Sequence, residues 1–242
     1  MKTAVITGAS GGIGSAIAAK LASDGYNTIL NYNKSQLKAE KLCEHLVSQG
    51  FNAVTFKADV SQSEEADALI AFAAKEFGSA DILVNNAGIA QQKLFTDITD
   101  EDYDRMFNSN VRSVFNCCRA ALPYMIHNKW GRIVNISSMW GVCGASCEVH
   151  YSASKAAVIG LTKALAREVG PSGITVNCIA PGLIDTPMNA ALDKETIKSL
   201  CEETPAGRIG TPDDIASAVS FFVSDGASFT TGQVLSVDGG FI

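Results

Sequence analysis

Apolar residues fall into two alternating patterns along the chain. Short runs that are apolar at nearly every position, and rich in Val and Ile, predict β-strands that helices cover on both faces. Longer stretches between them repeat apolar residues every three or four positions, as at Ala66, Leu69, Ile70 and Ala73, which predicts helices with one buried side. The predicted strands span residues 3–7, 28–32, 53–58, 81–85, 131–136, 175–179 and 234–237.

The alternation of strand and helix determines the expected fold class. The clearest predicted helices span about 13–24, 100–126 and 151–169, and others follow residues 32 and 58. Strands that alternate with helices form parallel sheets with helices on both faces. We therefore expect an α/β, doubly wound (Rossmann) fold with a parallel sheet of about seven strands, as one domain over residues 1–242. Residues 183–210 follow the carboxyl end of a strand and do not continue the alternation of strands and helices. They form either a substrate lid or an inert surface excursion.

Composition and charge narrow the function classes. A chain that is 47% hydrophobic and 18% charged is not intrinsically disordered. The formal net charge of −6 gives no basic field to attract nucleic acid or anionic lipid. No apolar run approaches the roughly 18 residues of a membrane helix, and the first residues lack the anatomy of a signal peptide, so we expect a cytoplasmic protein. The seven cysteines and three histidines are scattered, which predicts reduced thiols and no metal site.

A glycine-rich turn joins the first predicted strand to the first predicted helix. Its glycines, Gly8-x-x-x-Gly12-x-Gly14, permit a tight turn and let backbone N–H groups approach a pyrophosphate at a helix N-terminus. No Gly-Lys-Ser/Thr follows, which argues against a nucleotidase P-loop. Glycines also serve purely structural turns, but the position at the first strand–helix junction favours dinucleotide binding.

Tyr151 and Lys155 lie four residues apart at the start of a helical pattern, so they share one helix face. A phenol with a pKa near 10 is a poor acid–base catalyst at neutral pH. An ammonium at about 5 Å, at an effective dielectric of about 20, would lower that pKa by roughly two units. Tyr151 is then a candidate proton donor to a carbonyl oxygen, and Ser138, after the strand at 131–136, could bond the same oxygen.

Taken together, these motifs closely resemble the short-chain dehydrogenase/reductase family. The matching segments run in family order over nearly the whole chain, and jointly they are very specific. They are residues 7–14, Asn85-Asn86-Ala87-Gly88, Asn110, Ser137-Ser138, Tyr151-x-x-x-Lys155, Pro181-Gly182 and Asp238-Gly239-Gly240.

The resemblance implies a catalytic tetrad of Asn110, Ser138, Tyr151 and Lys155. Ser138 and Tyr151 would hold the carbonyl, Lys155 would bind the nicotinamide ribose and lower the tyrosine pKa, and Asn110 would hold a water of a proton relay. It also implies a homotetramer. Besides Tyr151 and Lys155, the implied cofactor contacts are Gly8, Ser10, Gly12, Ile13, Gly14, Asp59, Val60, Asn86, Ala87, Gly88, Pro181, Gly182 and Ile184.

The end of the second strand bears on the choice of cofactor. NAD-preferring dinucleotide folds usually offer an acidic residue about 20 residues past the glycine loop, for the ribose 2′-hydroxyl. Here the strand ends at Tyr32, Asn33 and Lys34, and no acidic residue lies between Asp24 and Glu40. An uncharged end and a lysine suit a 2′-phosphate, so NADP(H) is favoured over NAD(H), although many NADP-dependent relatives carry Arg where this chain has Gly11. The alternative interpretation of Lys34 is that it is a solvated surface residue that does not contact the cofactor.

Two substrates remain open. Most of the chain resembles 3-oxoacyl-[acyl-carrier-protein] reductases of fatty acid biosynthesis, which dock an acidic carrier protein on basic residues; Lys129 and Arg132 remain for this, whereas Ser172 replaces another. That group usually has Gln-x-Asn before the tyrosine, where this chain has Glu148-Val149-His150. The segment from Ser138 to Tyr151, with Trp140 and Glu148, is similar instead to elongation factor P 5-aminopentanone reductases, whose ketone ends in a primary amine.

The sequence also leaves two functions other than ketone reduction to consider. A nucleotide-sensing protein without catalysis is one alternative, and the intact tetrad argues against it. Oxidation of an alcohol is another, because sequence does not set direction, but a preference for NADP favours reduction. Loss of NADPH absorbance that depends on a carbonyl compound discriminates among them.

Overall fold

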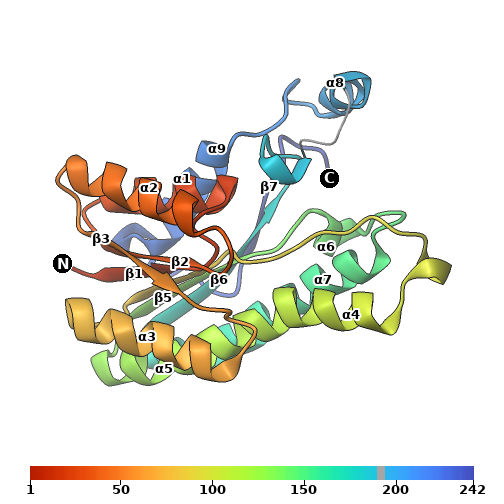
Figure 1. Ribbon diagram of the computed structural model, residues 1–242. Helices are drawn as coiled ribbons and strands as arrows, with labels where there is room; N and C mark the ends of the chain where they lie inside the picture. The colour runs from red at the N-terminus through yellow and green to blue at the C-terminus, as the bar shows by residue number, and fades with distance from the viewer. Residues whose placement is uncertain (190–193) are drawn as a thin grey trace.

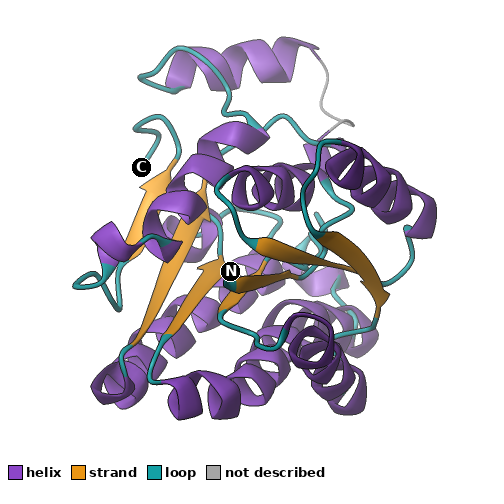
Figure 2. Ribbon diagram, turned by 90° about the vertical axis from the view of Figure 1, so that its left-hand side faces the viewer, coloured by secondary structure: helices purple, strands orange, loops and turns teal. Residues whose placement is uncertain are grey.

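The computed structural model describes residues 1–189 and 194–242, and this part of the chain is built on one parallel sheet (Figures 1 and 2). Its seven strands lie in the order β3-β2-β1-β4-β5-β6-β7. They are β1 (Thr3–Ile6), β2 (Asn27–Tyr32), β3 (Ala53–Lys57), β4 (Ile82–Asn85), β5 (Gly131–Ile136), β6 (Ile174–Pro181) and β7 (Val234–Val237). The predicted doubly wound α/β fold with about seven strands is confirmed.

Helices cover both faces of the sheet, as Figures 1 and 2 show. One face carries α1 (Gly12–Ser23), α2 (Gln36–Ser48) and α9 (Pro212–Val223), and the other carries α3 (Ser63–Phe77), α5 (Ser113–Asn128) and α7 (Val149–Val169). The remaining helices are α4 (Asp100–Phe107), α6 (Trp140–Cys143) and α8 (Lys194–Glu203). No helix in the described residues is long and apolar enough to cross a membrane.

Alternate residues of each strand enter opposite cores. On β1, Ala4 and Ile6 pack towards α1 and α9, whereas Val5 packs towards α3, α5 and α7. All four residues of β1 are buried. Because side chains alternate across a strand, a strand covered on both sides needs apolar residues throughout, which explains the uninterrupted runs in the sequence.

Two regions differ from the sequence-based prediction. The single helix expected over 100–126 is two helices, α4 and α5, joined by a π-helical turn at Asn108–Arg112. Such turns insert an extra residue into a helix and are frequent at functional sites. The helix α9, which begins at the capping box Thr211–Asp214, was not predicted at all.

The sheet order locates the ligand crevice. From β1 the chain continues outward to β2 and β3, and then returns to β4 on the other side of β1. Ligands of open α/β sheets bind at the carboxyl ends of the strands where the order reverses, which here is between β1 and β4.

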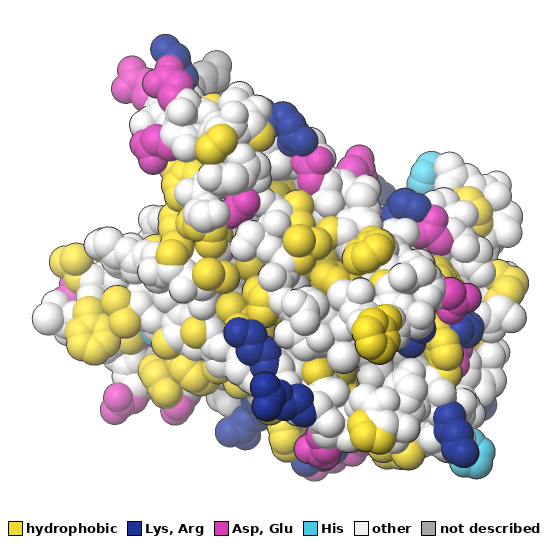
Figure 3. All heavy atoms as spheres, turned by 180° about the vertical axis from the view of Figure 1, so that it is seen from behind, with side chains coloured by type: hydrophobic (Ala, Val, Ile, Leu, Met, Phe, Trp, Pro, Cys, Tyr) yellow, Lys and Arg dark blue, Asp and Glu magenta, His cyan; other side chains and the backbone are white. Residues whose placement is uncertain are grey.

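The irregular segment 183–210 begins at this same edge. Hydrogen bonds from Gly210 N to Leu183 O and from Asp185 N to Gly210 O, both 2.9 Å, join its two ends. Between them, α8 projects from the rest of the molecule, with acidic side chains towards its outer end (Figure 3). Residues 190–193, which fall within the segment predicted as a lid, lie outside the described residues.

Candidate active site

A tight loop joins β1 to α1 and forms one end of the cleft. Gly8 has a φ of +63°, a backbone conformation that favours glycine. A Cβ at Gly14 would collide with the carbonyl oxygen of Gly8 and lie 2.6 Å from Nδ2 of Asn86. Helix α1 starts with no acidic residue in its first turn and no side-chain cap from Gly11. The first N–H groups of α1 are therefore free to bind an anion, and the glycines leave room for one.

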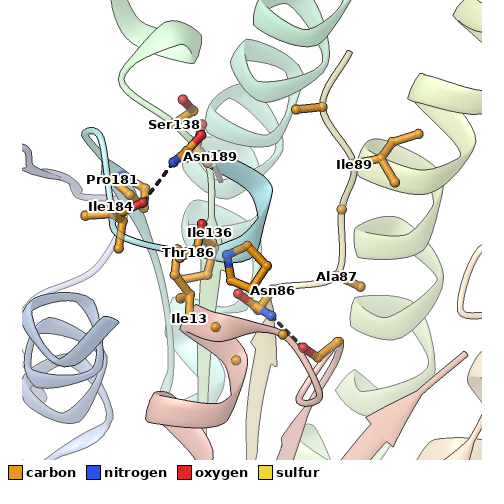
Figure 4. A pocket seen from close by; sticks show the side chains of 18 of the residues that line it. Ile13, Asn86, Ala87, Ile89, Ile136, Ser138, Pro181, Ile184, Thr186 and Asn189 are labelled. Atoms are coloured by element: carbon orange, nitrogen blue, oxygen red, sulfur yellow. Dashed lines mark hydrogen bonds between the residues drawn. The ribbon is translucent and has the colours of Figure 1, made fainter. Parts of the chain in front are cut away.

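Asn86 holds this loop in place from the end of β4. Its Nδ2 donates to the carbonyl oxygens of Thr7 (3.0 Å) and Gly8 (3.1 Å), one of which is drawn in Figure 4. In return, Thr7 Oγ1 accepts hydrogen bonds from the backbone N–H groups of Asn86 and Ala87, both 3.0 Å. The amide of Asn86 thus spans the β1–β4 switch point and sets the position of the loop.

A cleft of about 630 Å³ extends from this loop to α6 and α7. Its volume is within the range of ligand and cofactor sites. The predicted site residues that line it are Gly8, Ser10, Gly12, Ile13, Gly14, Asn86, Ala87, Gly88, Ser138, Trp140, Glu148, Tyr151, Lys155, Pro181, Gly182 and Ile184.

Six predicted site residues are not among those that line the cleft. They are Tyr32, Asn33, Lys34, Asp59, Val60 and Asn110. Tyr32 and Val60 are buried, and Lys34 is exposed. The Asp59 carboxylate accepts hydrogen bonds from Ser61 N (3.1 Å) and Ser61 Oγ (2.7 Å), so it caps its own turn.

Sequence reasoning missed other residues of the cleft. Lys38, in the first turn of α2, lines the cleft. The signal was available, because the first turn of a helix that follows β2 lies at the carboxyl edge of the sheet. From the irregular segment, Thr186, Pro187 and Asn189 also line the cleft, and Asn189 Nδ2 donates to Ile184 O at 2.8 Å (Figure 4).

Asn110 occupies the π-helical turn between α4 and α5 and is almost fully buried. Its Oδ1 accepts from Ile89 N (2.8 Å), and its Nδ2 donates to Ile89 O (3.0 Å) and Ser154 Oγ (3.0 Å). A Cβ at Gly88 would lie 3.0 Å from Asn110 Oδ1 and 3.3 Å from Lys155 Nζ. Gly88 therefore lies between the two side chains, and its lack of a side chain leaves the space between them open.

Lys155 is buried beneath the cleft floor, with 5% of its surface exposed. Its Nζ donates to Ile136 O at 3.0 Å and lies 5.8 Å from the centre of the Tyr151 ring. Burial lowers the pKa of Lys155 to about 8, because the charged ammonium loses its hydration. Gly141 permits the close packing of α6 here, since a Cβ would lie 2.8 Å from Lys155 Cβ.

Tyr151 faces the cleft beside Ser138. Burial raises the pKa of Tyr151 to about 12, more than the hydrogen bond with Ser138 lowers it, and the Glu148 carboxylate raises it further. Among the protein's own groups burial has the largest effect, so the pKa of Tyr151 is raised and not lowered as expected. The phenol therefore holds its proton at neutral pH, and it becomes a competent acid only where a neighbouring charge stabilises the tyrosinate.

These features define an α/β protein with a ligand-sized cleft that Ser138, Tyr151 and Lys155 line together with a glycine-rich loop. A family model described as enoyl-(acyl carrier protein) reductase matches residues 8–242. The chain is 42% identical over 239 residues to the 3-oxoacyl-[acyl-carrier-protein] reductase FabG of Staphylococcus aureus, covering 99% of this chain and 97% of that protein. It is 44% identical over 240 residues to the uncharacterized oxidoreductase YmfI of Bacillus subtilis, covering 99% and 98%. The chain belongs to the short-chain dehydrogenase/reductase family and is an oxidoreductase of that family.

Proposed function

We propose that the protein is an NADPH-dependent ketoreductase that reduces a ketone to a secondary alcohol. The observation that carries this proposal is that Tyr151, Ser138 and Lys155 line the same cleft as the glycine loop and the uncapped N-terminus of α1. The glycine loop, with Gly8 and Gly14, fits a pyrophosphate, and the bound nicotinamide would supply the hydride.

Each side chain has a distinct role in this proposal. Ser138 and Tyr151 donate hydrogen bonds to the ketone oxygen, and Tyr151 transfers its proton to that oxygen as the carbonyl carbon accepts the hydride. The Lys155 ammonium then stabilises the tyrosinate until it is reprotonated, and we propose that Asn110 supports this proton path through the space at Gly88. Residues 183–210 act as the substrate lid.

The lead substrate is a 3-oxoacyl thioester carried by acyl carrier protein. The relatives at 41–42% identity are named as reductases of this substrate, and they align over nearly the full chain. The expected docking residue Arg132 does not support this, because it is buried, lies over the Trp130 ring and donates to Gly131 O (2.9 Å). The direct test is NADPH consumption that depends on an acetoacetyl thioester; no turnover with any ketone would instead favour a nucleotide-sensing protein.

Lys38 is the best candidate for the cofactor's 2′-phosphate. It lines the cleft, whereas Lys34 does not. Because a charge-assisted contact is worth about 1.5–3 kcal/mol, Lys38→Ala is expected to raise the KM for NADPH about tenfold while leaving that for NADH nearly unchanged. Lys41→Ala, an exposed residue of α2 that does not line the cleft, is the matched control. Steady-state kinetics with both cofactors decide, and equal effects on NADPH and NADH would refute the assignment, as would a wild-type preference for NADH.

A second candidate substrate is a ketone that ends in a primary amine, such as the 5-aminopentanone modification of elongation factor P. Glu148 is the only carboxylate among the described residues that line the cleft, and Trp140 lines it as well. The Oε1 atom of Glu148 accepts a hydrogen bond from Gln92 Nε2 at 3.1 Å, which orients the carboxylate. A carboxylate and an indole that line one cleft are both groups that bind an ammonium.

Glu148→Gln tests this second candidate. A charge-assisted hydrogen bond of about 1.5–3 kcal/mol predicts a ten- to hundredfold loss of kcat/KM for an amine-bearing ketone. A neutral acyl thioester should lose little. The measurement is the ratio of kcat/KM for two ketones, one ending in an amine and one in a methyl group, in wild type and variant. If the ratio does not change, Glu148 has no role in binding an amine.

The surface suggests self-association, and we propose a homotetramer. Exposed aromatic and aliphatic side chains occur on α5, at Phe115, Tyr124 and Ile126, and near β7, at Phe229 and Leu235. Hydrophobic side chains on the back face are visible in Figure 3. Burial of such side chains favours association, and the molar mass measured by light scattering tests the proposal.

A further inference from the structure

Two segments outside the proposed tetrad are joined by three hydrogen bonds. His150 Nε2 bonds Gln91 Oε1 (3.1 Å), Gln92 Nε2 donates to Glu148 Oε1 (3.1 Å), and Lys93 N donates to Cys147 O (2.7 Å). We call this contact between residues 91–93 and residues 147–150 the clasp. Its second segment leads directly into Tyr151.

The clasp is anchored to α4 through Asp102. Gln91 Nε2 donates to Asp102 Oδ1 (2.9 Å), and Lys93 Nζ pairs with Asp102 Oδ2 (2.6 Å). Asp102 also forms the capping box of α4 with Thr99. These bonds hold the pKa of the Asp102 carboxyl well below its usual range, so it is ionised and only accepts hydrogen bonds.

The anchor determines the proton position on His150. The Asp102 carboxylate can only accept, so it accepts a hydrogen bond from the side-chain nitrogen of Gln91. The side-chain oxygen of Gln91 then faces His150, and because this oxygen is an acceptor, His150 must donate from Nε2. In the neutral ring Nδ1 then carries a lone pair. This atom is buried without a hydrogen-bond partner among the described residues, and His150 is only 3% exposed. A buried polar atom without a partner costs stability, so the ring is not explained by stability alone.

The backbone before α7 is also strained. Cys147 has a φ of +60°, which is uncommon for a residue with a side chain. Such a conformation persists where surrounding contacts hold it, and the hydrogen bond from Lys93 N to Cys147 O is one of them. The turn that precedes Tyr151 is therefore held from across the clasp.

Both segments of the clasp lead directly to the cleft. Gly88, Ile89 and Ala90, just before Gln91, line it, and so do Glu148 and Tyr151. His150 itself does not line the cleft. A shift of about 1 Å in the position of a catalytic group can cost about 100-fold in rate, so a contact that fixes the position of Tyr151 relative to residues 88–90 affects catalysis directly.

We propose that His150 is a positioning residue for ketone reduction: its hydrogen bond to Gln91 fixes the first turn of α7, and hence the Tyr151 hydroxyl, relative to residues 88–90. This inference rests on the proposed function. His150 acts through Tyr151 and touches neither the ketone nor the cofactor.

His150→Phe tests the proposal, because it keeps an aromatic ring but removes the donor to Gln91. We expect kcat for ketone reduction to fall about tenfold, with the KM for NADPH within about twofold of wild type. The deuterium isotope effect on kcat, measured with 4-deuterated NADPH, should rise as hydride transfer becomes slower. His150→Gln, whose amide can donate to Gln91, should restore most of the rate. In a protein that already carries Gln91→Leu, the further substitution His150→Phe should lower kcat little more.

Thr162→Val is the matched control. Thr162 is buried on the same helix and bonded to Asn135 (2.9 Å), but it does not line the cleft. This variant should lose stability without the rise in isotope effect. Equal slowing by Thr162→Val, or fully additive effects of His150→Phe and Gln91→Leu, would overturn the positioning role.

Amide hydrogen exchange separates this inference from the proposed function. Exchange in residues 88–94 and 145–155 should accelerate in His150→Phe and not in Thr162→Val, whether or not the wild type reduces a ketone. Unchanged exchange in His150→Phe would refute the clasp, whereas a wild type without reductase activity but with this exchange pattern refutes only the proposed function.

Discussion

Tyr151→Phe is expected to lower kcat for ketone reduction by at least about 100-fold, the lower range for loss of a general acid. The substitution removes only the hydroxyl that neighbours Ser138, and leaves the ring between α7 and the cleft in place. The glycine loop and Lys38 are unaffected, so the Kd for NADPH should change little. The effect therefore belongs to kcat and not to cofactor binding.

Two measurements check this expectation. Fluorescence titration with NADPH gives the Kd, and NADPH consumption with a saturating ketone gives kcat. Tyr103→Phe is the control, because Tyr103 on α4 is exposed, stacks on Phe107 at 4.4 Å and does not line the cleft. Near-normal turnover by Tyr151→Phe would show that Tyr151 is not the acid.

The sheet could be predicted because every strand obeys one local rule. Runs such as residues 3–7 and 131–136 are apolar on both faces, and only a strand between two helix layers requires this. The π-helical turn at Asn108–Arg112 could not be predicted, because helical spacing of apolar residues continues through it. It depends on a contact distant in sequence, the pairing of the Asn110 amide with both backbone groups of Ile89.

In the candidate site, too, features that depend on local spacing could be predicted, and features that depend on burial or on distant contacts could not. Spacing placed Tyr151 and Lys155 on one helix face, and the structure brings both to the cleft with Ser138. The direction of the Tyr151 pKa shift was wrong because a Coulomb estimate from sequence does not include burial, which shifts the pKa of the phenol upwards and that of Lys155 downwards. The His150–Gln91 contact joins residues 59 positions apart, so no local pattern indicates it.

Lys155→Met is expected to reduce kcat at least about 100-fold, as loss of a stabilising charge at a developing oxyanion does. In the wild type, kcat/KM for ketone reduction should fall above pH 8, because Lys155, with a pKa lowered to about 8, then loses the charge that stabilises the tyrosinate. Tyr151, with a pKa near 12, remains protonated over this range. A pH–rate profile checks the result. If the rate stays level to pH 10, Lys155 either keeps an ordinary pKa or acts uncharged, and unfolding measured at both pH values distinguishes the two.

The same substitution should change the pH dependence of stability in a defined direction. The pKa of Lys155 is lowered from 10.5 to about 8 on folding, so between these pH values Lys155 binds more protons in the unfolded chain than in the folded one, and its contribution to the free energy of unfolding rises with pH. Below pH 8 the buried ammonium costs about 3 kcal/mol, and above pH 10.5 this cost is gone. Lys155→Met has no such group, and the contributions of the shared titrating groups cancel in the difference, apart from that of Cys178, whose pKa the Lys155 charge lowers. The wild type should therefore gain about 2–3 kcal/mol relative to the variant between pH 7 and pH 10 in urea unfolding.

The unpaired Ile136 carbonyl lowers the variant's stability equally at both pH values and does not affect the comparison. A stability difference that does not vary with pH would mean that Lys155 keeps its ordinary pKa in the folded protein, and the expected fall in rate above pH 8 would then lose its basis.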